Sequence, residues 1–264
     1  MLEAGTPSAI QIGLPAVFAS GSQAQFEVVR QWLKICDENH KHGSLQHPVS
    51  GGQIENATWP TRILDVGIKG EGFIRLRETS PQHKGEYVAL SHRWGKPTHF
   101  CTFRSNLSEH KRGIPLERLP ATFRDAVLTT RALGFRYLWI DSVCIIQGPD
   151  GDFSVEAKRM EQVFSAATCV LAASDALGQQ DGFLKERKER DYVTFQGSSD
   201  QQTYYICEAI DDFHAHVLKS PLSSRGWVLQ EHALARRTIF FTEHQMYWEC
   251  GEGVRCETGT KMTK

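Results

Sequence analysis

The sequence lacks an excess of charge of either sign. Its 264 residues include 30 Lys and Arg against 31 Asp and Glu, which gives a net charge of −1. A protein that binds nucleic acid generally carries a basic excess, so we expect no nucleic-acid partner. Only 22 glycines and 10 prolines are present, which excludes collagen-like and low-complexity chains. The 40% hydrophobic and 23% charged residues are typical of a globular protein with a sizeable core.

Long apolar runs and a secretion signal are also missing. No stretch approaches the roughly 20 apolar residues that span a bilayer, so no membrane span is expected. The first 20 residues have no basic region, and Gly13 and Pro15 interrupt their apolar stretch, unlike a signal peptide. The 7 cysteines are odd in number and scattered, without the dense spacing of a disulfide framework. The sequence therefore predicts buried free thiols and a reducing, cytoplasmic location.

Hydrophobic periodicity predicts helices and strands along most of the chain. Phe26, Val29, Trp32, Leu33 and Cys36 recur at helical spacing and indicate an amphipathic helix. Further helices are expected over 119–133, over 153–166 and from 225 onward. The expected strands are 61–66, 73–77, 87–91, 137–141 with an extension over 143–146, 169–173, 204–207, 237–241 and 245–250.

From residue 87 onward the expected order is strand, helix, strand, helix, strand, insertion, helix, strand. This alternation predicts an α/β fold with a mostly parallel central sheet and helices on both faces. The insertion is expected near 177–222. The predicted organisation is a flexible leader over 1–24, an N-terminal helix with short strands over 25–82, the main domain over 83–252 and a C-terminal tail over 253–264.

Polar residues follow three of the buried strands, and they are the first candidates for chemistry. They are Ser91 to Trp94, Asp141 with Ser142, and Ser174 with Asp175. Open α/β sheets bind ligands beyond the carboxyl ends of their strands. The sequence therefore predicts a site at this edge of the sheet.

Several common site types are absent from the sequence. It holds neither a G-x-G-x-x-G nor a Walker A pattern, which argues against dinucleotide oxidoreduction and ATPase chemistry. No histidine–aspartate relay accompanies Ser91, which argues against a serine hydrolase. Around Cys36 and His40 the local sequence offers two or three zinc ligands at best, and a structural site needs four. We therefore expect no metal and no bound cofactor.

Four blocks of sequence, taken in order, carry a family resemblance. They are Tyr87–Gly95, the long stretch from Leu119–Ala126 to Leu133–Gln147, Arg225–Glu231 with its R-x-W-x-x-Q-E pattern, and Trp248–Cys250. Together they resemble the fungal heterokaryon-incompatibility (HET) domain, over roughly residues 26–250. The resemblance implies a role in fungal self/non-self recognition, where incompatible fusions end in programmed cell death. It also implies self-association or another incompatibility protein as partner. The family often has a second cysteine soon after the Cys36–His40 pair, and this sequence has none there.

The HET domain is distantly similar to the Toll/interleukin-1 receptor (TIR) domain. A TIR domain carries a tryptophan followed four positions later by a glutamate, as Trp227 and Glu231 are spaced here. In enzymatic TIR domains that glutamate is the catalytic residue for cleavage of the nicotinamide–ribose bond of NAD. The resemblance therefore implies a TIR-like topology and a catalytic Glu231, although Val228 stands where TIR domains often have cysteine.

Cleavage of that bond passes through an oxocarbenium-like state, which a nearby carboxylate stabilises. The candidate catalytic residues are Glu231, Asp141 and, as an alternative acid, Glu156. The candidate binding residues for an NAD or NADP substrate are Ser91, His92, Arg93, Trp94, Trp227 and Arg225. Among these, a planar guanidinium suits pyrophosphate and an indole can stack on a base.

Each candidate also has a structural interpretation. Glu231 could pair with Arg225 or Arg236, and Asp141 could cap a turn. His92 could be a general base or a loop residue with a satisfied hydrogen bond. The guanidinium of Arg93 could serve an ion pair, while Trp94 and Trp227 could pack in the core. The alternative function is a non-catalytic signalling scaffold that acts by self-assembly.

Overall fold

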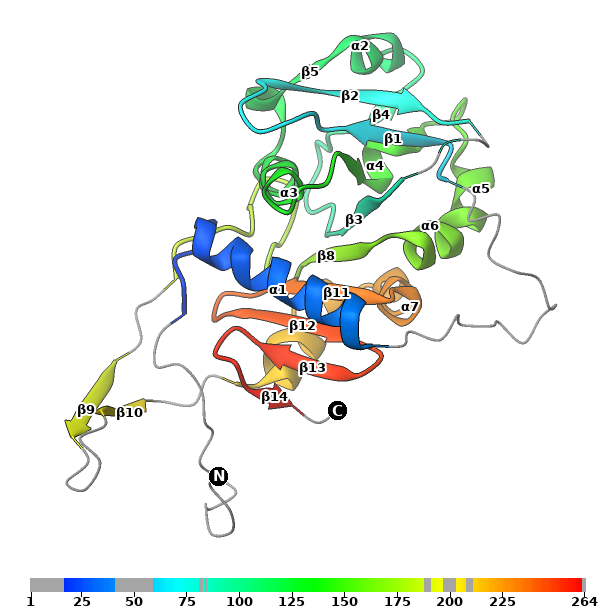
Figure 1. The fold of residues 1–264 in the computed structure, drawn as a ribbon. Helices are drawn as coiled ribbons and strands as arrows, with labels where there is room; N and C mark the ends of the chain where they lie inside the picture. The colour runs from blue at the N-terminus through cyan, green and yellow to red at the C-terminus, as the bar shows by residue number, and fades with distance from the viewer. Residues whose placement is uncertain are drawn as a thin grey trace, which may run out of the picture.

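A ten-stranded sheet runs through the centre of the protein (Figure 1). The computed structural model describes residues 17–40, 59–80, 83, 85–187, 191–196, 203–207 and 211–262. The strand order is β14-β13-β12-β11-β8-β3-β6-β1-β2-β5. The strands of this sheet are β1 (Arg62–Asp65), β2 (Phe73–Glu78), β3 (Tyr87–Ser91), β5 (Ile114–Pro115), β6 (Tyr137–Trp139), β8 (Cys169–Ala173), β11 (Arg237–Phe241), β12 (Met246–Cys250), β13 (Gly253–Cys256) and β14 (Lys261–Met262).

Two small two-stranded sheets and the helices complete the fold. The small sheets pair β9 (Tyr192–Gln196) with β10 (Thr203–Cys207), and β4 (Thr102–Phe103) with β7 (Ile146–Gln147). The α-helices are α1 (Gln23–Asn39), α2 (Leu107–Arg112), α3 (Ala121–Ala132), α4 (Asp141–Cys144), α5 (Phe153–Glu156), α6 (Met160–Ala166) and α7 (Gly226–Leu234). Short helical turns are η1 (Leu116–Arg118), η2 (Ala157–Arg159), the π-helical η3 (His214–Leu218) and η4 (Leu222–Ser224).

The α/β class is confirmed, but the prediction of a mostly parallel sheet is wrong. Within the described ten-stranded sheet, only the four central strands, β11, β8, β3 and β6, pair in parallel. The strands β12 to β14 on one side and β1, β2 and β5 on the other all pair antiparallel. A parallel pair needs a crossover of a dozen or more residues. Residues 242–245, which join β11 to β12, are too few for one, so that pair forms a hairpin.

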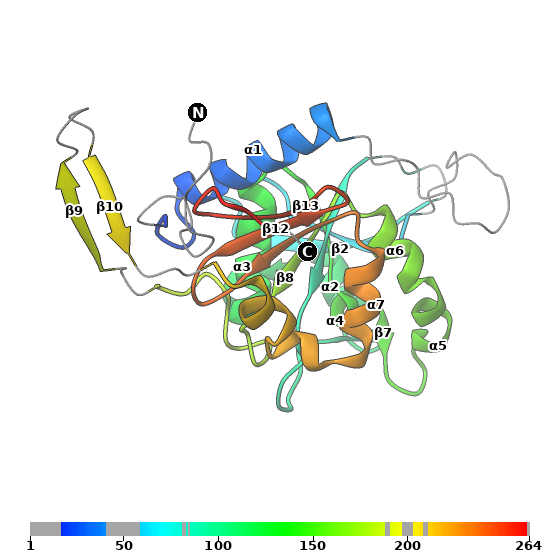
Figure 2. The ribbon, with the colours of Figure 1, turned by 90° about the horizontal axis from the view of Figure 1, so that it is seen from below.

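The parallel core has the strand order of a doubly wound sheet. Numbered along the chain, β3, β6, β8 and β11 are first to fourth, and they lie side by side in the order 2-1-3-4. Helices α1 and α3 cover one face, and α6 and α7 cover the other (Figure 2). All five residues of β3 and of β8 are buried, as expected for strands covered on both faces. The order reverses between β3 and β8, which is the point where such sheets bind ligands.

The N-terminal helix was predicted correctly. Ser22 caps α1 by accepting a hydrogen bond of 3.1 Å from the Gln25 backbone N–H. The apolar side of the helix, which includes Phe26, Val29 and Trp32, is buried as the periodicity predicted. Most of the predicted leader, residues 1–16, lies outside the described residues.

The segment over 143–146 does not extend the strand β6, contrary to the prediction. Residues 141–144 form the buried helical turn α4, in which Cys144 donates a backbone hydrogen bond of 2.7 Å to Ile140. Ile146 and Gln147 then form the short strand β7. β-branched residues favour a strand, but here the turn lets the chain leave the sheet directly after Ile140. The helix predicted over 153–166 is confirmed as α5, η2 and α6 in succession.

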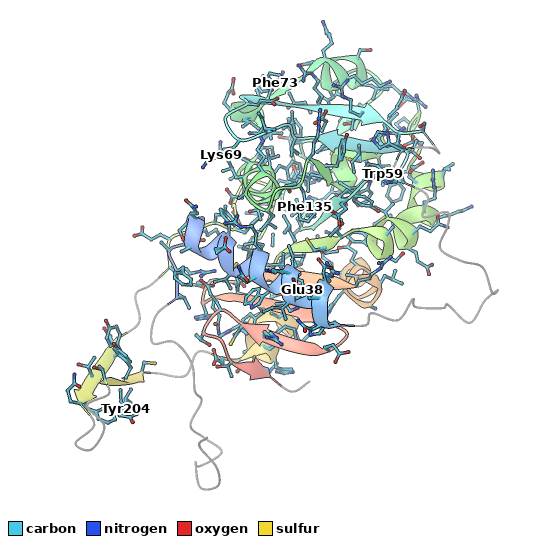
Figure 3. The ribbon with its side chains drawn as sticks, viewed as in Figure 1. Glu38, Trp59, Lys69, Phe73, Phe135 and Tyr204 are labelled. Atoms are coloured by element: carbon cyan, nitrogen blue, oxygen red, sulfur yellow. The ribbon has the colours of Figure 1, made fainter. Side chains whose placement is uncertain are left out.

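The region around 177–222 holds a hairpin of which the sequence predicted only one strand. β9 and β10 pair antiparallel and project away from the body of the protein (Figures 1 and 2). Figure 3 shows the side chains of this hairpin, with Tyr204 labelled. Both strands are exposed along nearly their whole length, which is unusual for such apolar residues.

Two further predictions concern cysteines and membranes. All 7 cysteines lie within the described residues and none of them forms a disulfide, and every one except Cys207 is buried, as predicted. Among the helices that the structure describes, none has both the length and the apolar character needed to cross a membrane.

Candidate functional site

Two side chains distant in sequence meet at the carboxyl edge of the parallel core. Ser91 is the last residue of β3, and Glu231 lies in α7. The Ser91 hydroxyl donates a hydrogen bond of 2.5 Å to Oε2 of Glu231. Ser91 and Glu231 are only 3% and 5% exposed. The contact therefore lies at the switch point between β3 and β8, inside the protein.

Burial changes the acidity of Glu231. It raises the pKa of the carboxyl from 4.5 to about 7, and the negative charge of Asp141 adds to the rise. The hydrogen bond from Ser91 and the positive charge of Arg225 act in the opposite direction but are weaker. A group with a pKa near 7 exchanges its proton readily at neutral pH, which is the property that general acid–base catalysis requires.

Asp141 lies beside this pair, at the start of α4. Its carboxylate accepts hydrogen bonds from the Trp94 indole N–H at 2.8 Å and from the Ser142 backbone N–H at 2.6 Å. It thus satisfies one backbone N–H in the first turn of α4 and at the same time fixes the indole ring. The structural and the functional interpretation of Asp141 are compatible in this geometry.

His92 is buried next to Asp141 and is neutral at pH 7. Burial lowers the pKa of the imidazole to about 4, although the Asp141 carboxylate raises it in part. Nδ1 of His92 lies 3.7 Å from Oδ1 of Asp141. In the described part of the chain, Nε2 of His92 and the buried hydroxyl of Ser174 have no hydrogen-bond partner. Since β3 and β8 are neighbours, these polar atoms lie at the carboxyl ends of adjacent strands.

The two arginines of the candidate set differ in their contacts. Arg225 precedes α7 and donates a short hydrogen bond to the backbone carbonyl of His92, which ties the start of α7 to the loop after β3. Arg93 is half-buried, and no acidic side chain pairs with it within the described ranges.

The predicted tryptophans and Glu156 lie in three different settings. Trp94 is half-buried, and its ring meets that of His99 edge-on at 5.4 Å. Trp227 lies in the first turn of α7. Glu156, at the end of α5, accepts a hydrogen bond of 2.7 Å from Thr61 and lies 3.6 Å from Arg159. Glu156 thus belongs to a separate cluster beside β1, and the structure does not bring it to Ser91.

The loops that follow β3 and β8 make a close contact through two glycines, which no sequence pattern predicted. A Cβ atom on Gly95 would lie 2.6 Å from the Cα of Gly178, so neither position tolerates a side chain. Next to it, Gln179 accepts a hydrogen bond of 2.7 Å from the Phe100 backbone N–H and reaches toward Ser142 at 3.5 Å. Gln179 falls in the predicted insertion, where no pattern distinguishes it from a surface residue.

Two surface hollows of about 360 and 430 Å³ lie elsewhere. The first is lined mainly by α1 and β13, the second by β2 and α2. Neither includes a residue of the Ser91–Glu231 cluster, which we define as Ser91, His92, Asp141, Arg225 and Glu231.

Comparison with known proteins gives the family. A model of the heterokaryon incompatibility protein (HET) family matches residues 87–231, more than half of the chain. The chain belongs to the HET family. The match begins at the first residue of β3 and ends at Glu231, so the whole Ser91–Glu231 cluster lies in the HET domain.

One curated relative is heterokaryon incompatibility protein 6, OR allele, of Neurospora crassa. It is 26% identical to this chain over 196 residues, which make up 58% of the chain and 28% of the Neurospora protein. The HET chain thus aligns with little more than a quarter of that relative's length. No solved structure matches the HET chain.

Proposed function

We propose that this HET chain is a cytoplasmic effector of fungal self/non-self recognition and triggers programmed cell death by hydrolysing NAD or NADP. Membership of the HET family and the similarity to the Neurospora incompatibility protein support the role in incompatibility. The strand order 2-1-3-4 of the parallel core supports a TIR-like topology, with the antiparallel strands as additions on both sides.

The observation that carries the enzymatic proposal is the buried Glu231 carboxyl, with its raised pKa and its hydrogen bond to Ser91. In the reaction the bond between ribose C1′ and the nicotinamide nitrogen breaks. Its electron pair goes to the nicotinamide ring, which becomes neutral. Water adds to C1′ and loses one proton. The ionised Glu231 stabilises the oxocarbenium-like state and takes up that proton, which its pKa of about 7 permits.

The surrounding residues have complementary roles in this proposal. Ser91 holds the carboxyl in place until a ribose hydroxyl replaces it as hydrogen-bond donor. Arg93 binds the pyrophosphate, because no described acidic residue occupies its guanidinium. Asp141 orients the Trp94 indole, whose ring stacks on the nicotinamide or the adenine. No further cofactor is required, because water is the only co-reactant.

The burial of Ser91 and Glu231 sets a condition on substrate entry. With 3% and 5% exposure, neither side chain is open to a ligand of nucleotide size. The loop after β3 and the loop that contains Gly178 have to separate first. We therefore expect the activity to depend on self-assembly or on a partner protein, since binding of one or the other can hold the two loops apart.

The second candidate function is a scaffold that signals by self-assembly, and the β9–β10 hairpin favours it. Val193 and Ile206 pair across the hairpin and are 68% and 63% exposed. Exposed apolar residues on a projecting hairpin are typical of an interaction surface. On this account the partner is a second copy or another incompatibility protein.

Expression in fungal cells tests the two functions against each other. We expect the wild type to deplete NAD or NADP and to kill, and Glu231→Gln to do neither at equal protein level. Glu156→Gln is the matched control, because Glu156 is a buried carboxyl outside the cluster. Killing by Glu231→Gln, together with loss of killing in Val193→Lys, would reject the enzyme and favour the scaffold.

A further inference from the structure

A second chemical cluster lies outside the HET match, between α1 and β12. It consists of Cys36, His40 and Cys250, whose ligand atoms all lie within 4.8 Å of one another. Cys36 and Cys250 are buried, with 0% and 5% exposure, and His40 is partly exposed. The HET match covers residues 87–231, so the cluster belongs to the N- and C-terminal parts of the chain.

Two secondary-structure elements bring these residues together. Cys36 and His40 are four positions apart at the end of α1, and the His40 backbone N–H donates to the Cys36 carbonyl at 3.1 Å. Residues at this spacing share one face of a helix. Cys250 is the last residue of β12. Trp32 and Trp248 pack against each other with ring centroids 6.2 Å apart and hold the helix on the strand.

The distances between these side chains fit a tetrahedral metal. Sγ of Cys250 lies 3.4 Å from Nδ1 of His40, and a hydrogen bond joins the Cys36 and Cys250 thiols. Zinc bonds of 2.3 Å to sulfur and 2.0–2.1 Å to nitrogen place these ligand atoms about 3.6 Å apart in a tetrahedron. The side chains therefore need little movement to accept an ion.

We propose that Cys36, His40 and Cys250 bind one zinc ion. Thiolate and imidazole ligands select zinc over calcium or magnesium, which prefer oxygen. Binding releases the two thiol protons, so the pair of thiolates balances the charge of the ion. Three protein ligands leave the fourth tetrahedral position for water or a further ligand. The sequence alone predicted no metal because the stretch around Cys36 and His40 supplies two or three ligands at best. Cys250, the ligand that the structure adds, is 210 residues away from His40.

The location defines what the zinc ion does. It links the N-terminal helix to β12 and so joins two parts of the chain that flank the HET domain. Beside it, Arg237 of β11 forms an ion pair with Asp37 of α1, which joins the helix to the strand next to β12. The zinc ion cross-links α1 and β12 through three protein ligands, and the site is separate from the Ser91–Glu231 cluster. Its loss destabilises the packing of α1 on the sheet.

The first experiment measures metal content. The chain is purified under reducing conditions from zinc-supplemented cells, and zinc is measured by elemental analysis. We expect about one zinc per chain in the wild type and a loss of at least tenfold in Cys36→Ala, His40→Ala and Cys250→Ala. Cys169→Ala is the matched control and keeps its zinc, because Cys169 is equally buried in β8 but lies outside the cluster.

The second experiment uses the wild type and does not depend on how the variants fold. After chelation under reducing conditions, Co²⁺ is titrated into the protein. We expect a thiolate-to-cobalt charge-transfer band that saturates at about one equivalent and a higher unfolding temperature after Zn²⁺ is restored. Absence of both zinc and the cobalt band from reduced wild type would overturn the proposal. A Cys36–Cys250 disulfide in freshly purified protein would do the same.

Discussion

Ser91 of β3 and Glu231 of α7 are 140 residues apart in sequence, yet the serine hydroxyl donates a 2.5 Å hydrogen bond to the buried carboxyl. This contact joins the first strand of the parallel core to the helix that precedes its fourth strand. It also places a carboxyl with a pKa of about 7 at the switch point of the sheet. The stability and the proposed chemistry of the HET domain both depend on this carboxyl.

Glu231→Gln should stabilise the protein at alkaline pH. The folded-state pKa of about 7 lies above the ordinary 4.5, so the folded protein binds the proton more tightly and loses stability as pH rises through this range. The glutamine keeps an oxygen that accepts from Ser91 but carries no charge. We expect a gain of about 3 kcal/mol at pH 8 that disappears below pH 4.5. Urea unfolding at several pH values measures it, and an equal effect at every pH would contradict the account.

His92→Gln should have the opposite pH dependence. The pKa of His92 falls from 6.5 to about 4 in the folded protein, so the unfolded chain binds the proton more tightly. Its contribution to stability is present above pH 6.5 and is lost as pH falls toward 4.

Glu231 and His92 therefore oppose each other between about pH 4.5 and 6.5 in the wild type. We expect the loss of stability on acidification to be steeper in Glu231→Gln and shallower in His92→Gln than in the wild type. The same series of urea curves tests this. Parallel pH profiles for the three proteins would show that one of the two groups does not titrate as described.

Gly95→Ala should lower the free energy of unfolding more than a comparable glycine substitution elsewhere. Gly95 and Gly70 both have positive φ angles, 77° and 98°, but only Gly95 contacts another backbone. We expect Gly70→Ala to destabilise the protein by about 1–2 kcal/mol, because alanine is strained at this positive φ angle. The contact with Gly178 should raise the cost of Gly95→Ala to about 2–4 kcal/mol. Chemical denaturation compares them, and equal costs would mean that the two loops separate freely.

Lysine substitutions on the β9–β10 hairpin should reduce self-association without affecting the fold. Val193 and Ile206 are largely exposed, so Val193→Lys and Ile206→Lys should each change stability by no more than about 0.5 kcal/mol. Sedimentation of the wild type and the double variant over a range of concentrations measures association. If the two proteins sediment alike at every concentration, the hairpin is not the contact surface.

The sequence predicted the central part of the fold better than its edges. The buried runs of β3 and β8 and the apolar face of α1 were readable, because burial on one or both faces leaves a periodic pattern. The sequence did not show whether the outer strands pair parallel or antiparallel, because pairing direction depends on connection length and on neighbours that are distant in sequence. Residues 143–146 had the composition of a strand but turn away from the sheet, since backbone bonds to Ile140 decide their conformation.

The same limit applies to the two sites. Ser91, His92 and Asp141 could be named because polar residues at strand ends mark the edge where ligands bind. Glu231 was named through the HET and TIR resemblance, and only the structure brings it to Ser91. Gln179 carried no local signal. Cys250 lies in one of the family blocks, but nothing in the sequence linked it to Cys36 and His40, because His40 is 210 residues away.

Nicotinamide release by the purified chain tests the central proposal most directly. NAD or NADP is incubated with the wild type, Glu231→Gln and Glu156→Gln at high protein concentration, with and without a crowding agent that promotes assembly. We predict release by the wild type and by Glu156→Gln, and a loss of at least a hundredfold in folded Glu231→Gln, because its amide can neither ionise nor accept the proton. Equal release by the wild type and Glu231→Gln, or no release from either dinucleotide in any assembled state, would contradict the account.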